Sequence, residues 1–113
     1  GPVPISPRAR AIPLAPGNVL SDEPGLYRAG RWGIRVENLM VCQKDIETEF
    51  GRFLRFDALT MMPIDTRTLP EPFGDLADDL NRFNEARLAF LMPRVSDRCR
   101  RWLERAVKPV KAA

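Results

Sequence analysis

The stretch VLSDEPGLY fills residues 19–27, and the stretch GIRVEN follows it at residues 33–38. Both carry apolar residues in short runs bounded by glycine and proline, a pattern that is typical of β-strands. We therefore expect strands over residues 18–23 and 33–42, and we expect these two strands to pair antiparallel. A turn is predicted at residues 23–25, because Pro24 presets φ and Gly25 can take a positive φ.

The pattern on either side of this pair predicts an irregular start and two more strands. Five prolines interrupt residues 1–17, and each removes a backbone donor, so regular structure is not expected there. Apolar residues within that segment suggest that the chain starts partway through a larger unit. Further strands are predicted around Gly51, over residues 46–50 and 52–62.

After Pro63 the apolar residues follow a helical period. A proline-bearing linker at residues 66–74 leads to a helix that is expected to start at an N-cap, Asp75, and to end at Met92. Ser96 is expected to cap a second helix over residues 97–107. Strands followed by helices predict an α+β fold.

Composition excludes several classes of function. The 113 residues contain no histidine, which rules out a self-contained Ser-His-Asp triad and any histidine-ligated zinc site. No apolar run approaches twenty residues, so no membrane span is expected. The only two cysteines, Cys42 and Cys99, are interpreted as buried apolar positions of a reduced, intracellular protein.

The charge is uneven along the chain. The formal net charge is +3, yet residues 94–111 hold seven basic and two acidic residues. A solvated helix face explains this best, a subunit contact is the next interpretation, and nucleic-acid binding is not expected because no binding motif is present.

The second predicted strand carries two charged residues on one face. Side chains alternate along a strand, so Arg35, Glu37 and Leu39 share a side. One interpretation is a solvated face. The other places Glu37 in a site where Arg35 or a cation balances its charge, and antiparallel pairing would bring Glu23 close to Glu37. Carboxylate oxygens suit Mn²⁺, Mg²⁺ or Ca²⁺ and, less selectively, Zn²⁺.

These motifs resemble the last two metal-ligand motifs of Xaa-Pro aminopeptidase (aminopeptidase P), a pita-bread-fold metallopeptidase family. Further stretches are similar to the same family and extend the resemblance over the whole chain: Gly1-Pro2, residues 5–8, residues 59–65, residues 102–104 and Lys108-Pro109. The resemblance implies an α+β chain in which residues 1–54 are the C-terminal portion of the pita-bread catalytic domain. Residues 55–113 would then form a C-terminal subdomain with two helices.

The resemblance also implies roles for individual residues. Glu23 matches the glutamate that binds one of two metal ions, and Glu37 matches the glutamate that bridges both. Arg35 and Tyr27 match residues of a supporting hydrogen-bond network, whereas Asn38 is expected to be a structural strand residue. The ions, usually manganese with zinc or cobalt as alternatives, activate water for attack on the peptide bond before proline.

The chain departs from the family in lacking the two aspartates and the histidine that complete the metal site. We therefore expect a fragment that is inactive alone and binds metal weakly or not at all. The resemblance implies peptide substrates with proline in second position, a missing N-terminal part, a homodimer and a cytoplasmic location, with no nucleic acid or membrane partner. Alternatives are a non-catalytic folding or dimerisation module of the same family, or a fragment of a related prolidase.

Overall fold

The computed structural model describes residues 12–113, and the predictions for residues 1–11 lie outside the described residues. The chain divides into two compact units, Gly1–Thr60 and Met61–Ala113, which are described separately. The first unit is built from antiparallel strands and the second from helices, so the α+β prediction is confirmed. Among the described residues, no helix has the length and apolar character needed to cross a membrane.

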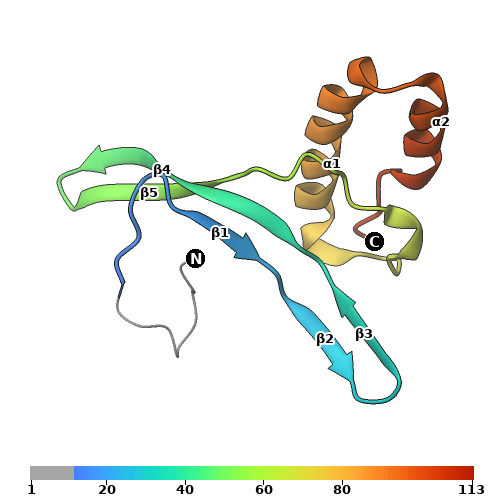
Figure 1. Ribbon diagram of the computed structural model, residues 1–113, viewed down its shortest axis with the longest axis horizontal. Coiled ribbons are helices and arrows are strands. Elements are labelled where there is room, and N and C mark those ends of the chain that lie inside the picture. Colours follow the sequence, from blue (N-terminus) through green and yellow to red (C-terminus); the bar gives the residue numbers. More distant parts are fainter. Residues whose placement is uncertain (1–11) are drawn as a thin grey trace. The chain divides into compact units, whose positions relative to one another are not determined.

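The first unit is a long antiparallel ribbon (Figure 1). One sheet has three strands in the order β1-β4-β5, and the other pairs β2 with β3. The bounds are β1 (Val19–Asp22), β2 (Gly25–Arg28), β3 (Trp32–Arg35), β4 (Asn38–Thr48) and β5 (Gly51–Ala58). The pairing of β1 with β4 confirms the predicted antiparallel contact between the strand near residue 20 and the strand near residue 40.

The chain reverses at a different place from the predicted turn. Residues 23–25 carry the chain onward from β1 into β2, and the reversal falls between β2 and β3 instead. There Gly30 has a φ of 68°, and the Arg31 N–H donates to the Arg28 carbonyl at 2.9 Å. Glycine adopts this left-handed conformation at little cost, which explains why the hairpin forms around Gly30.

The strand boundaries also differ from the predicted ones. The strand predicted over residues 33–42 is interrupted at Val36 and Glu37, between β3 and β4. The strand predicted over residues 46–50 is instead the end of β4, which pairs with β5 through a register shift between Lys44 and Glu47. Alternation of side chains cannot locate such interruptions, because apolar residues continue across them.

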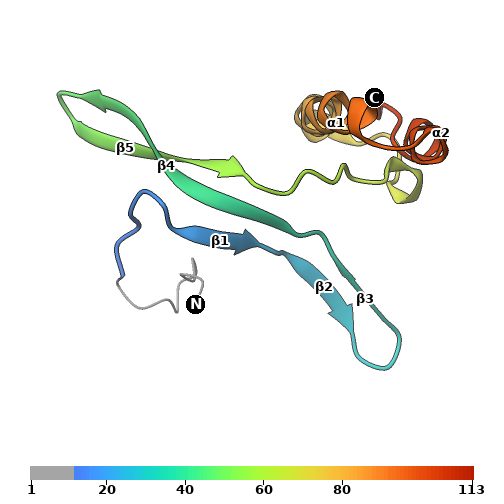
Figure 2. The ribbon, with the colours of Figure 1, turned by 45° about the horizontal axis from the view of Figure 1, so that its top comes forward.

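The second unit contains α1 (Ala77–Leu91) and α2 (Asp97–Ala106), with short 3₁₀ turns at Thr66–Thr68, Gly74–Leu76 and Met92–Arg94. Figures 1 and 2 both show α1 and α2 side by side. The predicted cap of the second helix is confirmed, because the Ser96 hydroxyl accepts from the Cys99 N–H at 3.3 Å. Asp75 is not the cap of the first helix, since it lies inside the 3₁₀ turn that precedes α1.

Two apolar clusters hold the second unit together. Ala77, Leu80 and Val110 form one, and Leu103, Ala106 and Val107 form the other. In the described part of the first unit, by contrast, only Leu20 and Cys42 are buried apolar residues. Cys99 is exposed, so the prediction of two buried cysteines is right for Cys42 and wrong for Cys99.

Candidate functional site

The strand register brings the two candidate glutamates face to face. Asp22 pairs with Asn38 in the β1–β4 ladder, and Gly25 pairs with Arg35 in the β2–β3 ladder. The two ladders therefore keep one register, and Glu23 falls opposite Glu37 between them. Directly opposed residues of an antiparallel pair point to the same side of the ribbon.

Arg35 joins this pair to Tyr27. Its Nη1 atom lies 3.3 Å from Glu23 Oε1, and its Nε–H donates to the Tyr27 hydroxyl at 2.7 Å. Strand alternation places all four side chains, those of Glu23, Tyr27, Arg35 and Glu37, on one face of the ribbon. We call this set the Glu–Arg–Tyr face.

The electrostatics of this face favour a cation. The Tyr27 hydroxyl first, then the charge of Glu23 and to a lesser degree that of Glu37, raise the pKa of Arg35 above its ordinary value. One guanidinium thus faces two carboxylates, which leaves a net negative charge. Facing carboxylates repel unless a cation takes up that charge, and their hard oxygens are the ligands that Mn²⁺ and Mg²⁺ prefer.

The described residues do not assemble a complete metal site. Within residues 12–113, no three Asp, Glu, Cys or His side chains come together as a metal site would require. Three of the aspartates are engaged in ion pairs: Asp45 and Asp57 pair with Arg55, and Asp65 pairs with Arg67. Glu23 and Arg35 are each nearly half exposed, with side-chain accessibilities of 44% and 45%. Glu37 is exposed as well, so both carboxylates are available to ligands from outside the described residues.

The sequence reasoning missed two further residues on this face. Gly25 and Gly33 flank Tyr27, and the ring of Tyr27 lies against both of them. The pairing of Tyr27 with Gly33 explains this contact. That pairing depends on the register between the two strands, which the sequence of either strand alone does not determine.

The opposite face of the hairpin is apolar and open. Leu26 is 69% exposed and Ile34 is 59% exposed. Together with Pro24, Gly25 and Val36 they line a shallow hollow. Within the described residues, this apolar face of the hairpin is therefore left exposed.

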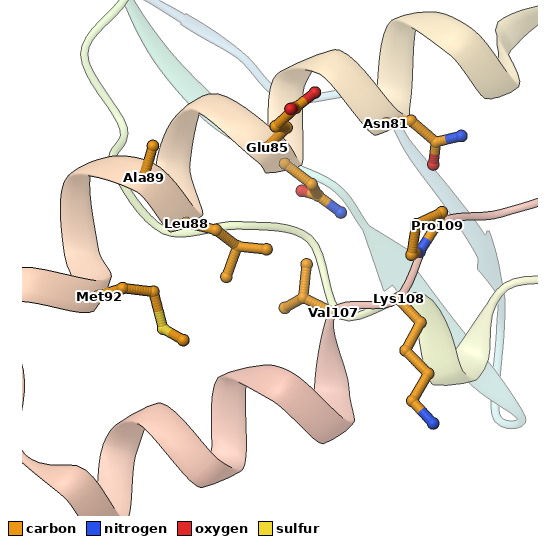
Figure 3. Close-up of a pocket in the computed structure, with 9 residues that line it drawn as sticks. Asn81, Glu85, Leu88, Ala89, Met92, Val107, Lys108 and Pro109 are labelled. Carbon is orange, nitrogen blue, oxygen red and sulfur yellow. The ribbon is translucent and has the colours of Figure 1, made fainter.

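A second hollow lies in the helical unit (Figure 3). It is an apolar groove of about 500 Å³ between α1 and the segment that follows α2. Figure 3 shows three apolar side chains pointing into it: Leu88 of α1, Met92 of the following 3₁₀ turn and Val107. Its two asparagines are already engaged: Asn84 bonds the backbone of Ile64, and Asn81 bonds that of Val110. The groove therefore offers apolar surface and little polar chemistry.

Comparison with known proteins places these features in a family. No family model matches the chain. A probable Xaa-Pro aminopeptidase P from Metarhizium acridum is 38% identical over 122 aligned positions, which cover 98% of this chain and 19% of that protein. A probable Xaa-Pro aminopeptidase P from Fusarium vanettenii is 48% identical over 80 positions, covering 61% of this chain and 13% of that protein.

A solved structure gives the same result. X-prolyl aminopeptidase from Caenorhabditis elegans, described as a cytosolic enzyme with a di-nuclear active site, matches with a TM-score of 0.64 and 29% identity. The match covers 97% of this chain and 19% of that structure.

Taken together, the fold and these matches relate the chain to one segment of proteins that are named as aminopeptidases. More specifically, the chain is homologous to one segment of the Xaa-Pro aminopeptidase P family. It spans about a fifth of the length of the first curated relatives, 19% in each of two Metarhizium proteins.

Proposed function

We propose that this chain is the C-terminal part of a two-metal Xaa-Pro aminopeptidase, an enzyme that hydrolyses the bond between an N-terminal residue and a following proline. The observation that carries the proposal is the position of Glu23 opposite Glu37, beside the Arg35–Tyr27 hydrogen bond. The similarity to Xaa-Pro aminopeptidases over 98% of the chain supports it. In this proposal residues 1–54 continue a pita-bread catalytic domain and residues 55–113 form the helical C-terminal subdomain.

Each residue of the Glu–Arg–Tyr face has a proposed role. Glu23 would hold one metal ion and Glu37 would be a ligand to both, and manganese is the proposed metal, with zinc and cobalt as alternatives. Arg35 holds the Glu23 carboxylate through its contact at 3.3 Å, and Tyr27 fixes Arg35 through the hydrogen bond at 2.7 Å. When bound, the metal ions would lower the pKa of a water molecule and polarise the scissile carbonyl.

The remaining ligands are proposed to come from a part of the enzyme outside this chain. The two glutamates and one arginine leave a negative charge for the ions, but two carboxylates do not fill a metal coordination sphere. Alone, the chain is proposed to be inactive and to bind metal weakly. A homodimer and a cytoplasmic location are proposed for the whole enzyme on the strength of the family resemblance.

A chimeric enzyme tests this proposal. The segment of the Caenorhabditis elegans enzyme that matches this chain is replaced by the chain, and hydrolysis of a peptide with proline in second position is measured. We expect the chimera to be active. Glu23→Gln and Glu37→Gln should each lower kcat/KM by more than the ~10–100-fold typical of changes outside the direct ligands.

The matched control is Glu47→Gln, which removes an exposed carboxylate paired with Arg52 at 3.9 Å and should leave kcat/KM unchanged. Full activity of the Glu37→Gln chimera would contradict the ligand assignment. A chimera that folds and binds metal but cleaves nothing would favour the non-catalytic module. One that cleaves only Xaa-Pro dipeptides would favour a prolidase.

Calorimetric titration of the 113-residue chain with Mn²⁺ tests the second part of the proposal. We expect weak binding, because within the described residues the acidic side chains do not assemble a complete site. Tight binding of two ions that Glu37→Gln abolishes would contradict the view that the chain needs ligands from elsewhere.

A further inference from the structure

Tyr27 is the single tyrosine of the chain, and its ring lies across two glycines. Gly33 is directly opposite Tyr27 in the β2–β3 ladder, and Gly25 lies two residues before it on the same strand. All three positions face the same side of the ribbon as Glu23 and Glu37. The ring therefore bends back from position 27, past Gly33 and over Gly25.

A side chain at either glycine would collide with the ring. A Cβ atom at position 33 would stand 2.6 Å from Tyr27 Cδ1 and 3.1 Å from Cε1. A Cβ atom at position 25 would stand 2.8 Å from both Cε2 and Cζ. These distances are shorter than carbon–carbon contact, so the ring would have to move.

Space is what these two positions require, and not an unusual backbone conformation. Gly17, Gly30, Gly51 and Gly74 have positive φ, and a Cβ at any of them would meet no atom within 4 Å. Gly25 and Gly33 differ in both respects. Neither is among the positive-φ glycines of the described chain, and the ring of Tyr27 crowds both. Other amino acids could adopt the backbone conformation of these two positions. The nearest atoms that would collide with their side chains belong to the ring of Tyr27.

The position of the ring determines where its hydroxyl lies. Gly25 is paired with Arg35, so a ring that crosses Gly25 brings its hydroxyl to the guanidinium. Arg35 Nε donates to that hydroxyl at 2.7 Å, and Arg35 Cζ lies 5.7 Å from the ring centroid. The same guanidinium contacts Glu23 at 3.3 Å. A series of contacts thus runs from the two glycines through the ring and the guanidinium to a carboxylate.

We propose that Gly25 and Gly33 are positioning residues: they form a seat for the Tyr27 ring, which sets the place of Arg35 and, through it, the orientation of the Glu23 carboxylate. The seat itself is a statement about this chain alone. Its effect on metal binding rests on the function proposed above.

A double-mutant cycle in the 113-residue chain tests the seat. Alanine is favoured over glycine in strands, so Gly33→Ala should stabilise the fold unless the ring opposes it. We expect Gly33→Ala to lower the urea midpoint when Tyr27 is present and not to lower it in the Tyr27→Ala background. An equal effect of Gly33→Ala in both backgrounds would overturn the proposal, whether or not the chain binds metal.

Proton NMR gives a second measure of the seat. An aromatic ring above Gly25 and Gly33 should shift their Hα protons upfield and give cross-peaks to the ring protons of Tyr27. Tyr27→Phe should keep these shifts, because the ring remains, and should remove the hydrogen bond to Arg35 Nε. Unshifted Hα protons in the folded parent chain would also overturn the proposal.

The effect on the site is measured as Mn²⁺ affinity in the chimeric enzyme. Gly25→Ala, Gly33→Ala and Tyr27→Phe should each raise the dissociation constant, on the order of 10–100-fold for residues that orient ligands. The control is Ile34→Val, on the opposite face of the same strand, which should not change it. Unchanged affinity in the glycine variants of a chimera that binds metal would overturn the positioning role. A parent chimera that binds no metal would instead count against the proposed function, and the double-mutant cycle would still decide whether the seat exists.

Discussion

Asp65, in the helical unit, forms an ion pair with Arg67. Its carboxylate accepts from the Arg67 backbone N–H at 3.0 Å and from Arg67 Nη2 at 2.6 Å. The side-chain hydrogen bonds from Arg67, followed by its backbone N–H, lower the pKa of Asp65. The ionised form is therefore the one that the folded state favours.

This pKa shift predicts a pH-dependent contribution to stability. A group whose pKa is lowered on folding stabilises the fold above its unfolded pKa, about 3.9 for aspartate, and loses that effect as the pH falls through the folded pKa. Asp65→Asn should therefore lower the urea midpoint at pH 7, and the difference from the parent chain should shrink below about pH 4. Urea unfolding at several pH values measures this.

Glu104→Gln is the control for losing one exposed carboxylate. A difference between Asp65→Asn and the parent chain that stays constant down to pH 2.5, roughly a unit below the unfolded pKa, would show that ionisation of Asp65 does not contribute.

For single residues, the sequence indicated which side of a strand a side chain faces, but not which distant residue it contacts. Alternation along a strand placed Arg35 and Glu37 on one face, and the structure has them so. The contact of Arg35 with Tyr27, eight residues away, depends on the hairpin around Gly30, and the sequence pointed to residues 23–25 for the turn. Local pattern fixes which side a residue faces, whereas its partner depends on where the chain reverses.

At the scale of elements, α2 depends on its cap. Ser96 has the extended backbone of a cap residue, and its hydroxyl accepts from the Cys99 N–H. Ser96→Ala should destabilise the chain by about 0.5–2 kcal/mol, because a backbone donor at the helix start loses its partner. Chemical denaturation measures this. Ser96→Asp keeps an acceptor at the same place and should stay near the parent value, so equal losses in both variants would contradict the capping explanation.

A buried asparagine bonds the helix α1 to the segment that precedes it. Asn84 is 5% exposed, and its amide accepts from the Ile64 N–H at 2.8 Å and donates to the Ile64 carbonyl at 3.0 Å. The side chain of Asn84 thus supplies a hydrogen-bond partner to both the N–H and the carbonyl of Ile64. The sequence did not predict this, since an asparagine within a helical pattern is ordinarily an exposed residue.

Removal of this side chain tests its contribution. Asn84→Ala leaves the backbone N–H and carbonyl of Ile64 without partners in a part-buried place, so we expect a loss of about 1–3 kcal/mol in the free energy of unfolding. The neighbouring Glu85→Ala removes an exposed side chain from the same helix and should stay within about 0.5 kcal/mol of the parent chain. Similar losses in the two variants would mean that the buried amide is not the cause, since alanine has a higher helix propensity than either residue that it replaces.

At the scale of the whole molecule, the strand unit exposes much of its apolar surface. Among its described residues Phe50 is 86% exposed, Leu26 69% and Ile34 59%. Among the described residues, strands β1 and β5 are the edges of the three-stranded sheet. Exposed apolar faces and free strand edges promote association with other chains.

We therefore expect the isolated 113-residue chain to self-associate. Sedimentation velocity at concentrations of tens of micromolar, on the order at which exposed surface becomes aggregation-prone, should show species larger than a monomer. Ile34→Thr should reduce this association, because it interrupts the apolar face of the hairpin. Leu76→Thr, which alters an apolar residue 63% exposed in the helical unit, is the control. A monomeric parent chain at these concentrations would contradict the expectation.

The sequence by itself determined the α+β order of the elements, the cap at Ser96 and the side of the strand on which Arg35 and Glu37 lie. Each of these follows from neighbours within a few residues, where backbone geometry and hydrogen-bond reach leave few options. The tertiary structure alone decided the reversal at Gly30, the opposition of Glu23 and Glu37, the seat of Tyr27 on two glycines and the hold of Asn84 on Ile64. Those depend on register and packing between distant residues, which the contacts of all the elements determine together.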